Sequence, residues 1–295
     1  MSVWLPCAPC TPRACVEPAG PVVAAPLAVL RLAAVTVLVG AGVLLSPLAG
    51  LVPAVVVRRW CRAVVRAAGV RVRITGSATP TGGLLLVANH ISWLDIPLLG
   101  AVRPARMLAK AEIRRWPVAG PLAARAALFI ERDRLRALPA TVARVAEALR
   151  GGLAVVAFPE GSTWCGRAQG PFRRAVFQAA LDAGVPVQPV RVHYRTIRGT
   201  ASTAPAFVGE DTLLASLWRV ASARDLVAEV EVRPALAPGA HPDRRALARA
   251  AQRHTLPEST RSHGAPSPGP VACGETVEEL GRPLARVADR VGEEA

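Results

Sequence analysis

The stretch VANHISWLDIP, from Val87 to Pro97, joins an apolar run to a polar turn. The residues Gly83–Ala88 are almost all apolar, as in a strand buried on both faces of a sheet. Asn89 and His90 follow at once, and polar groups at the mouth of an apolar run cost free energy unless they are hydrogen-bonded or used. Ligand sites of open α/β sheets lie at the carboxyl ends of strands, so this position predicts a functional site.

Asp95 stands five positions after His90. A helix that begins near Trp93 would bring Asp95 back towards the imidazole. A carboxylate bonded to one ring nitrogen fixes the tautomer and raises the basicity of the other nitrogen, which is how a His–Asp pair acts on a hydroxyl. From these residues alone, the alternative is a core histidine beside a first-turn aspartate that accepts from backbone amides.

Apolar strands alternate with amphipathic helices on both sides of this stretch. Besides Gly83–Ala88, strands are expected at Val70–Ile74, Arg106–Ala109, Ala127–Glu131, Leu153–Phe158, Val187–Tyr194 and Leu226–Val232. Helices are expected at Arg134–Arg150, which carries one apolar stripe, and at Phe172–Ala183, which Gly184 and Pro186 close. The pattern predicts an α/β fold with a central mixed, largely parallel sheet flanked by helices.

An uncharged run of 26 residues, Leu32–Val57, precedes these elements. As one helix it would span roughly 39 Å, more than a bilayer core, which predicts an N-terminal membrane segment. Pro47 and Pro53 leave open a kinked span or a two-helix segment that dips into one leaflet, and a buried core helix is the alternative. Arginines follow the run closely, at Arg58, Arg59, Arg62, Arg66, Arg71 and Arg73. By the positive-inside rule, the chain after the run faces the cytoplasm.

The formal net charge of +15 is carried almost entirely by arginine, because Lys110 is the only lysine. Such a charge indicates an anionic partner, which is a membrane face, a phosphate-bearing substrate or nucleic acid. The chain has one tyrosine and five phenylalanines and shows no aromatic RNA-binding strand, so no nucleic acid is expected. We expect a leader over 1–21, a membrane-embedded segment over 22–57, a catalytic domain over 58–255 and a disordered tail over 256–295, with a possible short helix at Thr276–Val291.

Six cysteines are too few for a disulfide scaffold in 295 residues. Cys7, Cys10 and Cys15 lie in the Pro-rich leader, and Cys7-x-x-Cys10 has the spacing of half a zinc site. No second half with that spacing follows, so no metal is expected. Cys61 and Cys165 are interpreted as free thiols of a reducing compartment.

The stretch NHISWLD resembles the H-x4-D motif of the lysophospholipid and glycerophosphate acyltransferases. Three further blocks follow in that family's order: AALFIERD with Phe129, Ile130 and Arg132, FPEGSTW with Phe158, Pro159, Glu160 and Gly161, and GVPVQPV with Pro186, Pro189 and Val190. The resemblance covers roughly residues 70–232. Four blocks in order are a much more specific signal than one.

The resemblance implies a glycerol-3-phosphate acyltransferase-like fold in an enzyme at the cell membrane, with its catalytic domain in the cytoplasm. Such an enzyme moves a fatty acyl chain from acyl-CoA or acyl-carrier protein to the free hydroxyl of a lysolipid, without a cofactor. His90 would be the general base and Asp95 its orienter. Arg132 would grip the anionic head group of the acceptor, and Glu160, Gly161 and Ser162 would shape the acceptor pocket.

Two positions depart from the family pattern. Ala126 replaces the usual glycine of the second block, and Thr163 stands where the third block usually has an arginine. By family frequency the expected acceptor is 1-acylglycerol-3-phosphate, which would give phosphatidic acid. The missing arginine leaves lyso-ornithine lipid or another lysolipid as the alternative, unless Arg173 or Arg174 compensates.

Other interpretations of the chain stay open. Arg191, His193 and Arg195 alternate along one expected strand, so they form either a second head-group site or a wet sheet face. A non-catalytic protein that binds anionic membranes is the alternative function. It would need neither His90 nor Asp95. A metal hydrolase is disfavoured because the five histidines show no ligand spacing.

Overall fold

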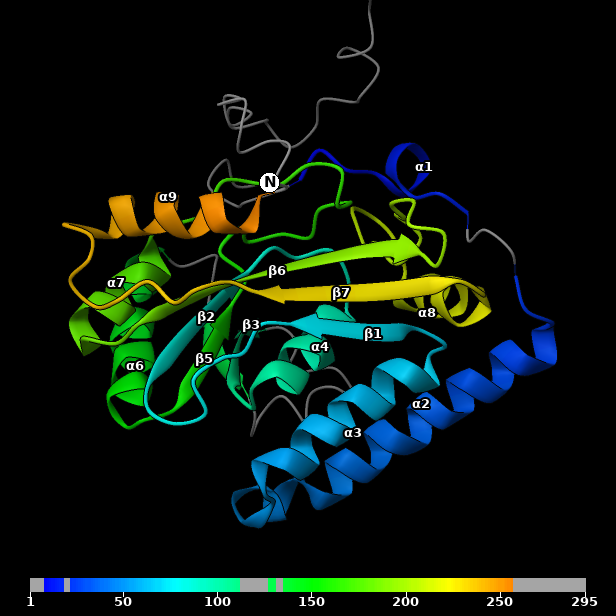
Figure 1. Cartoon of the computed structure of the whole chain (residues 1–295), viewed down its shortest axis with the longest axis horizontal. Coiled ribbons are helices and arrows are strands. Elements are labelled where there is room, and N and C mark those ends of the chain that lie inside the picture. The colour runs from blue at the N-terminus through cyan, green and yellow to red at the C-terminus, as the bar shows by residue number, and fades with distance from the viewer. Residues whose placement is uncertain (1–7, 19–21, 112–126, 131–134, 257–295) are drawn as a thin grey trace, which may run out of the picture.

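The computed structural model describes residues 8–18, 22–111, 127–130 and 135–256 (Figure 1). Its strands are β1 (Arg71–Thr75), β2 (Leu84–Ala88), β3 (Arg106–Lys110), β4 (Ala127–Ile130), β5 (Ala154–Ala157), β6 (Val187–Thr196) and β7 (Leu226–Val232). They form one sheet in the order β1-β7-β6-β2-β5-β3-β4. All neighbouring pairs are parallel except β6 and β7, which are antiparallel. The sheet is therefore mixed and largely parallel, as predicted.

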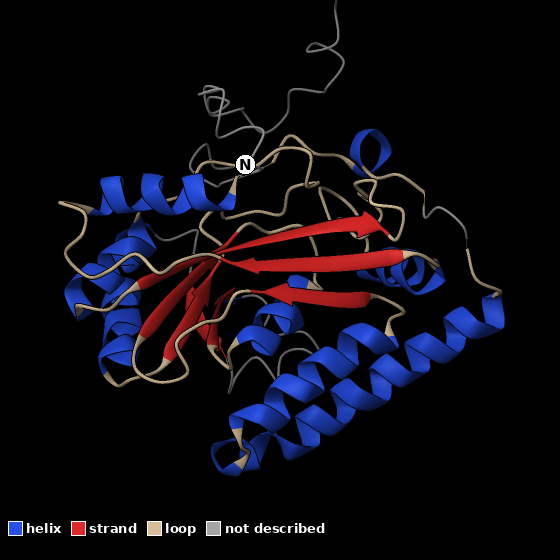
Figure 2. Cartoon of the chain, in the orientation of Figure 1, coloured by secondary structure: helices blue, strands red, loops and turns tan. Residues whose placement is uncertain are grey.

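Strand β2 lies at the centre of the sheet, between β6 and β5. Its five residues are all buried, because helices cover both faces of the sheet (Figure 2). Leu84, Leu86 and Ala88 belong to the apolar cluster on one face, and Leu85 and Val87 to the cluster on the other. The continuous apolar sequence of β2 follows from this two-sided burial.

The helices divide between the two faces of the sheet. On one face lie α2 (Ala25–Leu45), α3 (Ala54–Ala67), α4 (Asp95–Val102) and α8 (Leu213–Ser222). On the other lie α6 (Leu138–Arg150), α7 (Ala175–Ala183) and α9 (Arg244–Thr255). The short segments are α1 (Pro12–Cys15), the 3₁₀ turn η1 (Ser46–Leu51) and the 3₁₀ turn η3 (Leu135–Ala137).

The expected membrane segment is a pair of helices rather than one long span. Helix α2 and helix α3 pack side by side, joined by η1, and Pro53 is the N-cap residue of α3 (Figure 1). The prolines thus mark a break between two helices, and residue 57 lies inside α3. Arg31 lies inside α2, where its guanidinium donates to the carbonyls of Ala221 and Ala223, both at 2.7 Å. These bonds hold α2 against the end of α8.

Helix α2 and the turn after it expose many apolar side chains. Within the described residues, one helical stretch, Ala25–Leu48, is long and apolar enough to cross a membrane, and 11% of its 18-residue apolar window is buried. The exposed apolar residues of α2, η1 and α3 include Leu30, Val37, Leu44, Leu45, Leu48, Leu51 and Val56. Low burial distinguishes this helix from a core helix, so the core-helix alternative is disfavoured.

All seven expected strands are present, and each ends within two residues of the expected bounds. The helices α8 and α9 and the four-residue helix α1 were not predicted. Helix α9 carries a start signal that could have been recognised, because Asp243 caps it by accepting from the amides of Arg245 and Ala246, both at 2.7 Å. The expected tail and the helix at 276–291 lie outside the described residues.

Candidate active site

His90 and Asp95 lie at the carboxyl end of the central strand. The chain leaves the sheet after Ala88, turns, and starts helix α4 at Asp95. His90 Nδ1 is 2.8 Å from Asp95 Oδ2. The aspartate side chain is fully buried, whereas the imidazole keeps 20% of its surface exposed. With Nδ1 directed at the carboxylate, Nε2 is the ring nitrogen left for a proton transfer.

Asp95 accepts hydrogen bonds from several directions. Its Oδ2 accepts from the amides of Ile91 at 2.6 Å and Ser92 at 2.8 Å, and its Oδ1 accepts from the Tyr194 hydroxyl at 2.6 Å. The carboxylate also lies in the first turn of α4, where the helix dipole favours negative charge. A buried charge needs such partners, and here they also fix the position of His90.

Tyr194 is the site residue that the sequence pattern did not reveal. It is the only tyrosine in the chain, it lies in β6 and it is buried. Burial, together with the Asp95 charge, raises the pKa of Tyr194 well above its usual range. The phenol therefore stays protonated and donates to the carboxylate. The contact joins positions 99 residues apart, so local spacing could not predict it.

Asn89 extends the central strand with its side chain. Its Nδ2 donates to the Val192 carbonyl at 2.8 Å, and the Val192 amide donates to its Oδ1, also at 2.8 Å. The side chain thereby satisfies two groups of β6 that have no strand partner once β2 has ended. Both polar residues at the strand mouth are thus hydrogen-bonded, which explains their place after an apolar run.

The third sequence block follows the neighbouring strand β5 and contacts His90 at several points. The Phe158 ring stacks on the imidazole, with centroids 3.9 Å apart and planes inclined by 14°. Glu160 Oε2 accepts from the His90 amide at 2.7 Å, and Glu160 Oε1 accepts from the Gly170 amide at 3.2 Å. The Trp164 amide donates in turn to the His90 carbonyl at 2.8 Å. These contacts fix the ring and the backbone of His90 together.

Glu160 is buried, with 3% of its surface exposed. Burial raises the pKa of Glu160 well above its usual range, although the His90 and Gly170 amides oppose this shift. Its carboxyl group supports the histidine backbone, a use that the sequence did not indicate. Gly161 has a φ of +80°, a conformation that favours glycine and lets the chain turn after Glu160.

Other residues named from the sequence lie near this centre or outside the described residues. Arg132 and Ala126 lie outside them. Ser162 is half-buried, and its hydroxyl has no hydrogen-bond partner within the described part of the chain. Arg173 and Arg174 are exposed, and the Arg173 amide donates to the Pro159 carbonyl at 2.8 Å, which places Arg173 beside the third block.

The alternating cations of β6 are paired with carboxylates of β7. Arg191 contacts Glu231 at 3.3 Å, His193 Nε2 lies 2.7 Å from Glu229, and Arg195 also pairs with Glu229. Burial, with the Arg191 charge, lowers the pKa of His193. The same two glutamates also pair with Arg73 and Arg233, so each of these β6 cations has a carboxylate partner on β7.

A cavity of about 150 Å³ lies at the opposite end of the strands, near the start of β6. It is lined by residues that include Ala180, Leu181, Val187 and Leu236. Val187 begins β6, whereas His90 follows the carboxyl end of the parallel strand β2. This cavity is therefore separate from the His90–Asp95 centre.

Known proteins resemble this chain over the part that holds the site. A family model described as Acyltransferase matches residues 70–193. A lyso-ornithine lipid O-acyltransferase of Pseudomonas aeruginosa is 44% identical over 168 residues, which cover 55% of this chain and 62% of that protein. A 1-acyl-sn-glycerol-3-phosphate acyltransferase of Neisseria gonorrhoeae is 38% identical over 150 residues, which cover 50% and 58%. The chain thus spans about three-fifths of the length of these two relatives.

Two more matches extend further along the chain. A solved structure, the 1-acyl-sn-glycerophosphate acyltransferase of Thermotoga maritima, is 19% identical with a TM-score of 0.53, and covers 68% of this chain and 75% of its own. It shares the fold. A lyso-ornithine lipid O-acyltransferase of Rhodobacter capsulatus is 34% identical over 208 residues, which cover 65% of this chain and 71% of that protein. The chain belongs to the lysophospholipid acyltransferase family.

Proposed function

We propose that the protein transfers a fatty acyl chain from a thioester donor to the free hydroxyl of a lysolipid. The hydrogen bond between His90 and the buried Asp95 is the observation that carries this proposal. His90 Nε2 takes the proton of the acceptor hydroxyl as its oxygen attacks the thioester carbonyl. The carbon–sulfur bond then breaks, and the leaving thiolate takes the proton from the imidazolium, which restores the neutral histidine. The donor is acyl-CoA or acyl-carrier protein.

The identity of the acceptor depends on how many cations face its head group. Thr163 stands in place of an arginine, which removes one charge-assisted hydrogen bond worth about 1.5–3 kcal/mol to a phosphomonoester. Family frequency favours 1-acylglycerol-3-phosphate, but this gap and the similarity to lyso-ornithine lipid O-acyltransferases favour an amino-acid lysolipid. We therefore place lyso-ornithine lipid first and 1-acylglycerol-3-phosphate second. Arg132 is the proposed head-group ligand for either acceptor.

The lysolipid acceptor lies in a bilayer, so the site must reach one. We propose that the exposed apolar surface of α2 and η1 inserts into the cell membrane and that residues 58–255 form the catalytic domain on its cytoplasmic side. The arginines of α3, Arg58, Arg59, Arg62 and Arg66, would then lie at the anionic lipid surface.

The test is an assay of purified full-length protein with both lysolipids and with labelled acyl-CoA and acyl-carrier protein, read by mass spectrometry. We expect transfer to fall about 10²–10⁴-fold in His90→Ala. His241→Ala is the matched control, since that histidine lines the distant cavity. Thr163→Arg should shift kcat/KM towards 1-acylglycerol-3-phosphate. Transfer within a few-fold of wild type in His90→Ala would refute the proposal. Absence of product with every donor, with vesicle binding intact, would favour the non-catalytic alternative.

A further inference from the structure

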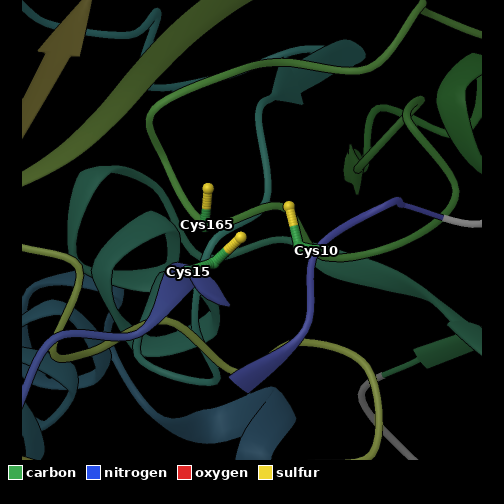
Figure 3. Close-up of side chains that lie close together, drawn as sticks. All are labelled: Cys10, Cys15 and Cys165. Atoms are coloured by element: carbon green, nitrogen blue, oxygen red, sulfur yellow. The ribbon is translucent and has the colours of Figure 1, made fainter. Parts of the chain in front are cut away.

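Three cysteine side chains from two distant segments lie together outside the His90–Asp95 centre (Figure 3). Cys10 and Cys15 belong to the leader, and Cys165 to the loop after β5. Their Sγ atoms all lie within 4.8 Å of one another. Cys10 and Cys165 are buried and Cys15 is half-buried, and all three are free thiols. The proposed acyl transfer uses none of them.

The leader is positioned here by contacts that do not involve sulfur. Helix α1 is capped by Thr11, whose hydroxyl accepts from the Ala14 amide at 3.3 Å, and the Cys15 amide donates to the Thr11 carbonyl at 3.0 Å. The Glu17 amide donates to the Thr203 hydroxyl at 2.9 Å, and the Glu17 carboxylate pairs with Arg167. The turn of α1 therefore returns Cys15 towards Cys10. The contact with Arg167 holds the leader against the loop of Cys165, and the contact with Thr203 holds it against the loop after β6.

We propose that Cys10, Cys15 and Cys165 bind a zinc ion. Zinc prefers tetrahedral thiolate ligands at about 2.3 Å, so that neighbouring sulfurs lie about 3.8 Å apart, a spacing that this cluster reaches with small movements. Three protein ligands leave one position for water or a further thiolate. A disulfide would use only two of the three sulfurs. Simple packing of small apolar side chains requires no convergence of three thiols.

The ion would join the leader to the loop of Cys165 and would take no part in acyl transfer. Cys165 directly follows Trp164, whose amide donates to the His90 carbonyl at 2.8 Å. The same loop ends near Gly170, whose amide donates to Glu160. Zinc bound by Cys165 would thus fix, through the leader, the loop that holds the backbone of His90.

The test is the metal content of full-length protein, expressed with zinc and purified in detergent under reducing conditions. We expect about one zinc ion per chain, lost in Cys165→Ala and in Cys15→Ser. Cys61→Ala is the matched control, because Cys61 is buried in α3 and should leave the zinc content unchanged. Cobalt(II) added to zinc-depleted wild type should give the visible d–d bands of tetrahedral coordination and thiolate charge-transfer absorption. This measurement needs no variant that could misfold.

Three results would overturn the proposal. The first is wild type without zinc and without a cobalt spectrum. The second is a Cys10–Cys165 disulfide in protein kept from air, seen by mass spectrometry. The third is iron with inorganic sulfide in place of zinc. Metal content is measured without substrate, so failure here is separate from failure of the proposed acyl transfer.

Discussion

At the scale of single residues, the side chain of Asp95 both orients the His90 ring and holds the turn that precedes α4. Its Oδ2 receives the His90 ring together with the amides of Ile91 and Ser92, and its Oδ1 receives Tyr194. The two amides need a hydrogen-bond acceptor at this position. Whatever replaces Asp95 must therefore keep an acceptor at this point, or both the turn and the imidazole lose their anchor.

Asp95→Asn keeps a hydrogen-bond acceptor at this position but removes the negative charge. The backbone amides should keep the amide oxygen of the asparagine at the Oδ2 position, so its NH2 group faces the Tyr194 oxygen, which can accept. The ring should then stay oriented while the negative charge that stabilises the imidazolium is lost. We expect kcat to fall at least about 10²-fold with KM nearly unchanged. Asp95→Ala should in addition lower the melting temperature. Equal melting temperatures of Asp95→Asn and Asp95→Ala would contradict the claim that the acceptor atom stabilises the turn.

Tyr194→Phe removes one donor from a buried carboxylate. We expect a loss of about 1–3 kcal/mol in the free energy of unfolding, because Asp95 Oδ1 loses its charge-assisted partner without gaining water. The measurement is chemical denaturation in detergent, with kcat followed in parallel. Wild-type stability together with wild-type kcat would show that the phenol contributes nothing to the site.

Glu160 provides a prediction for pH. Its folded-state pKa is raised by burial, so the folded state favours the neutral carboxyl group. The stability it contributes is fully present below the unfolded pKa and is lost as pH rises towards the folded pKa. Glu160→Gln cannot ionise, and any loss from its altered hydrogen bonds is independent of pH. The stability of the variant relative to wild type should therefore increase between acidic and neutral pH. Thermal unfolding at several pH values checks this, and a constant difference would contradict it.

At the scale of elements, the sequence predicted the strands and the contacts that depend only on neighbouring residues. All seven strands were expected because each is an apolar or alternating stretch between turn signals. The spacing of His90 and Asp95 also sufficed, because a turn between a strand and a helix brings them together. Tyr194 and Cys165 were not assigned to their clusters, because neither contact follows from neighbours in the chain. The order of the strands was also beyond reach, since it depends on tertiary packing.

Helices α3 and α4 offer a test of close packing. A Cβ atom added at Gly100 would lie 2.7 Å from the Cys61 Sγ, so the Cys61 side chain of α3 packs directly on the backbone of α4. Gly100→Ala should cost about 1–3 kcal/mol of stability through overpacking. Cys61→Ala in the same chain should recover most of it, because the sulfur is removed and alanine favours the helix. A double-mutant cycle measures the coupling, and additive effects would refute this close contact.

At the scale of the whole molecule, the tip of the α2–α3 pair should determine membrane binding. Replacing Leu44, Leu48 and Leu51 by glutamine should release the protein from anionic vesicles without unfolding it, because these side chains are exposed. The control is Ile197→Gln, which changes an exposed apolar residue at the end of β6. Vesicle sedimentation measures the bound fraction. Unchanged sedimentation of the triple variant would refute the insertion.

The contact between Gly100 and Cys61 has a consequence for how the enzyme responds to its lipid. Helix α3 packs against α2, whose exposed surface is proposed to insert, and α4 begins with Asp95. Because the Cys61 sulfur packs directly on the backbone of α4 at Gly100, a tilt of α3 also shifts the first turn of α4. The lateral pressure of the bilayer would then set the alignment of aspartate and histidine. We expect turnover to vary with the acyl-chain length of the bilayer lipids in nanodiscs that hold the same surface density of acceptor.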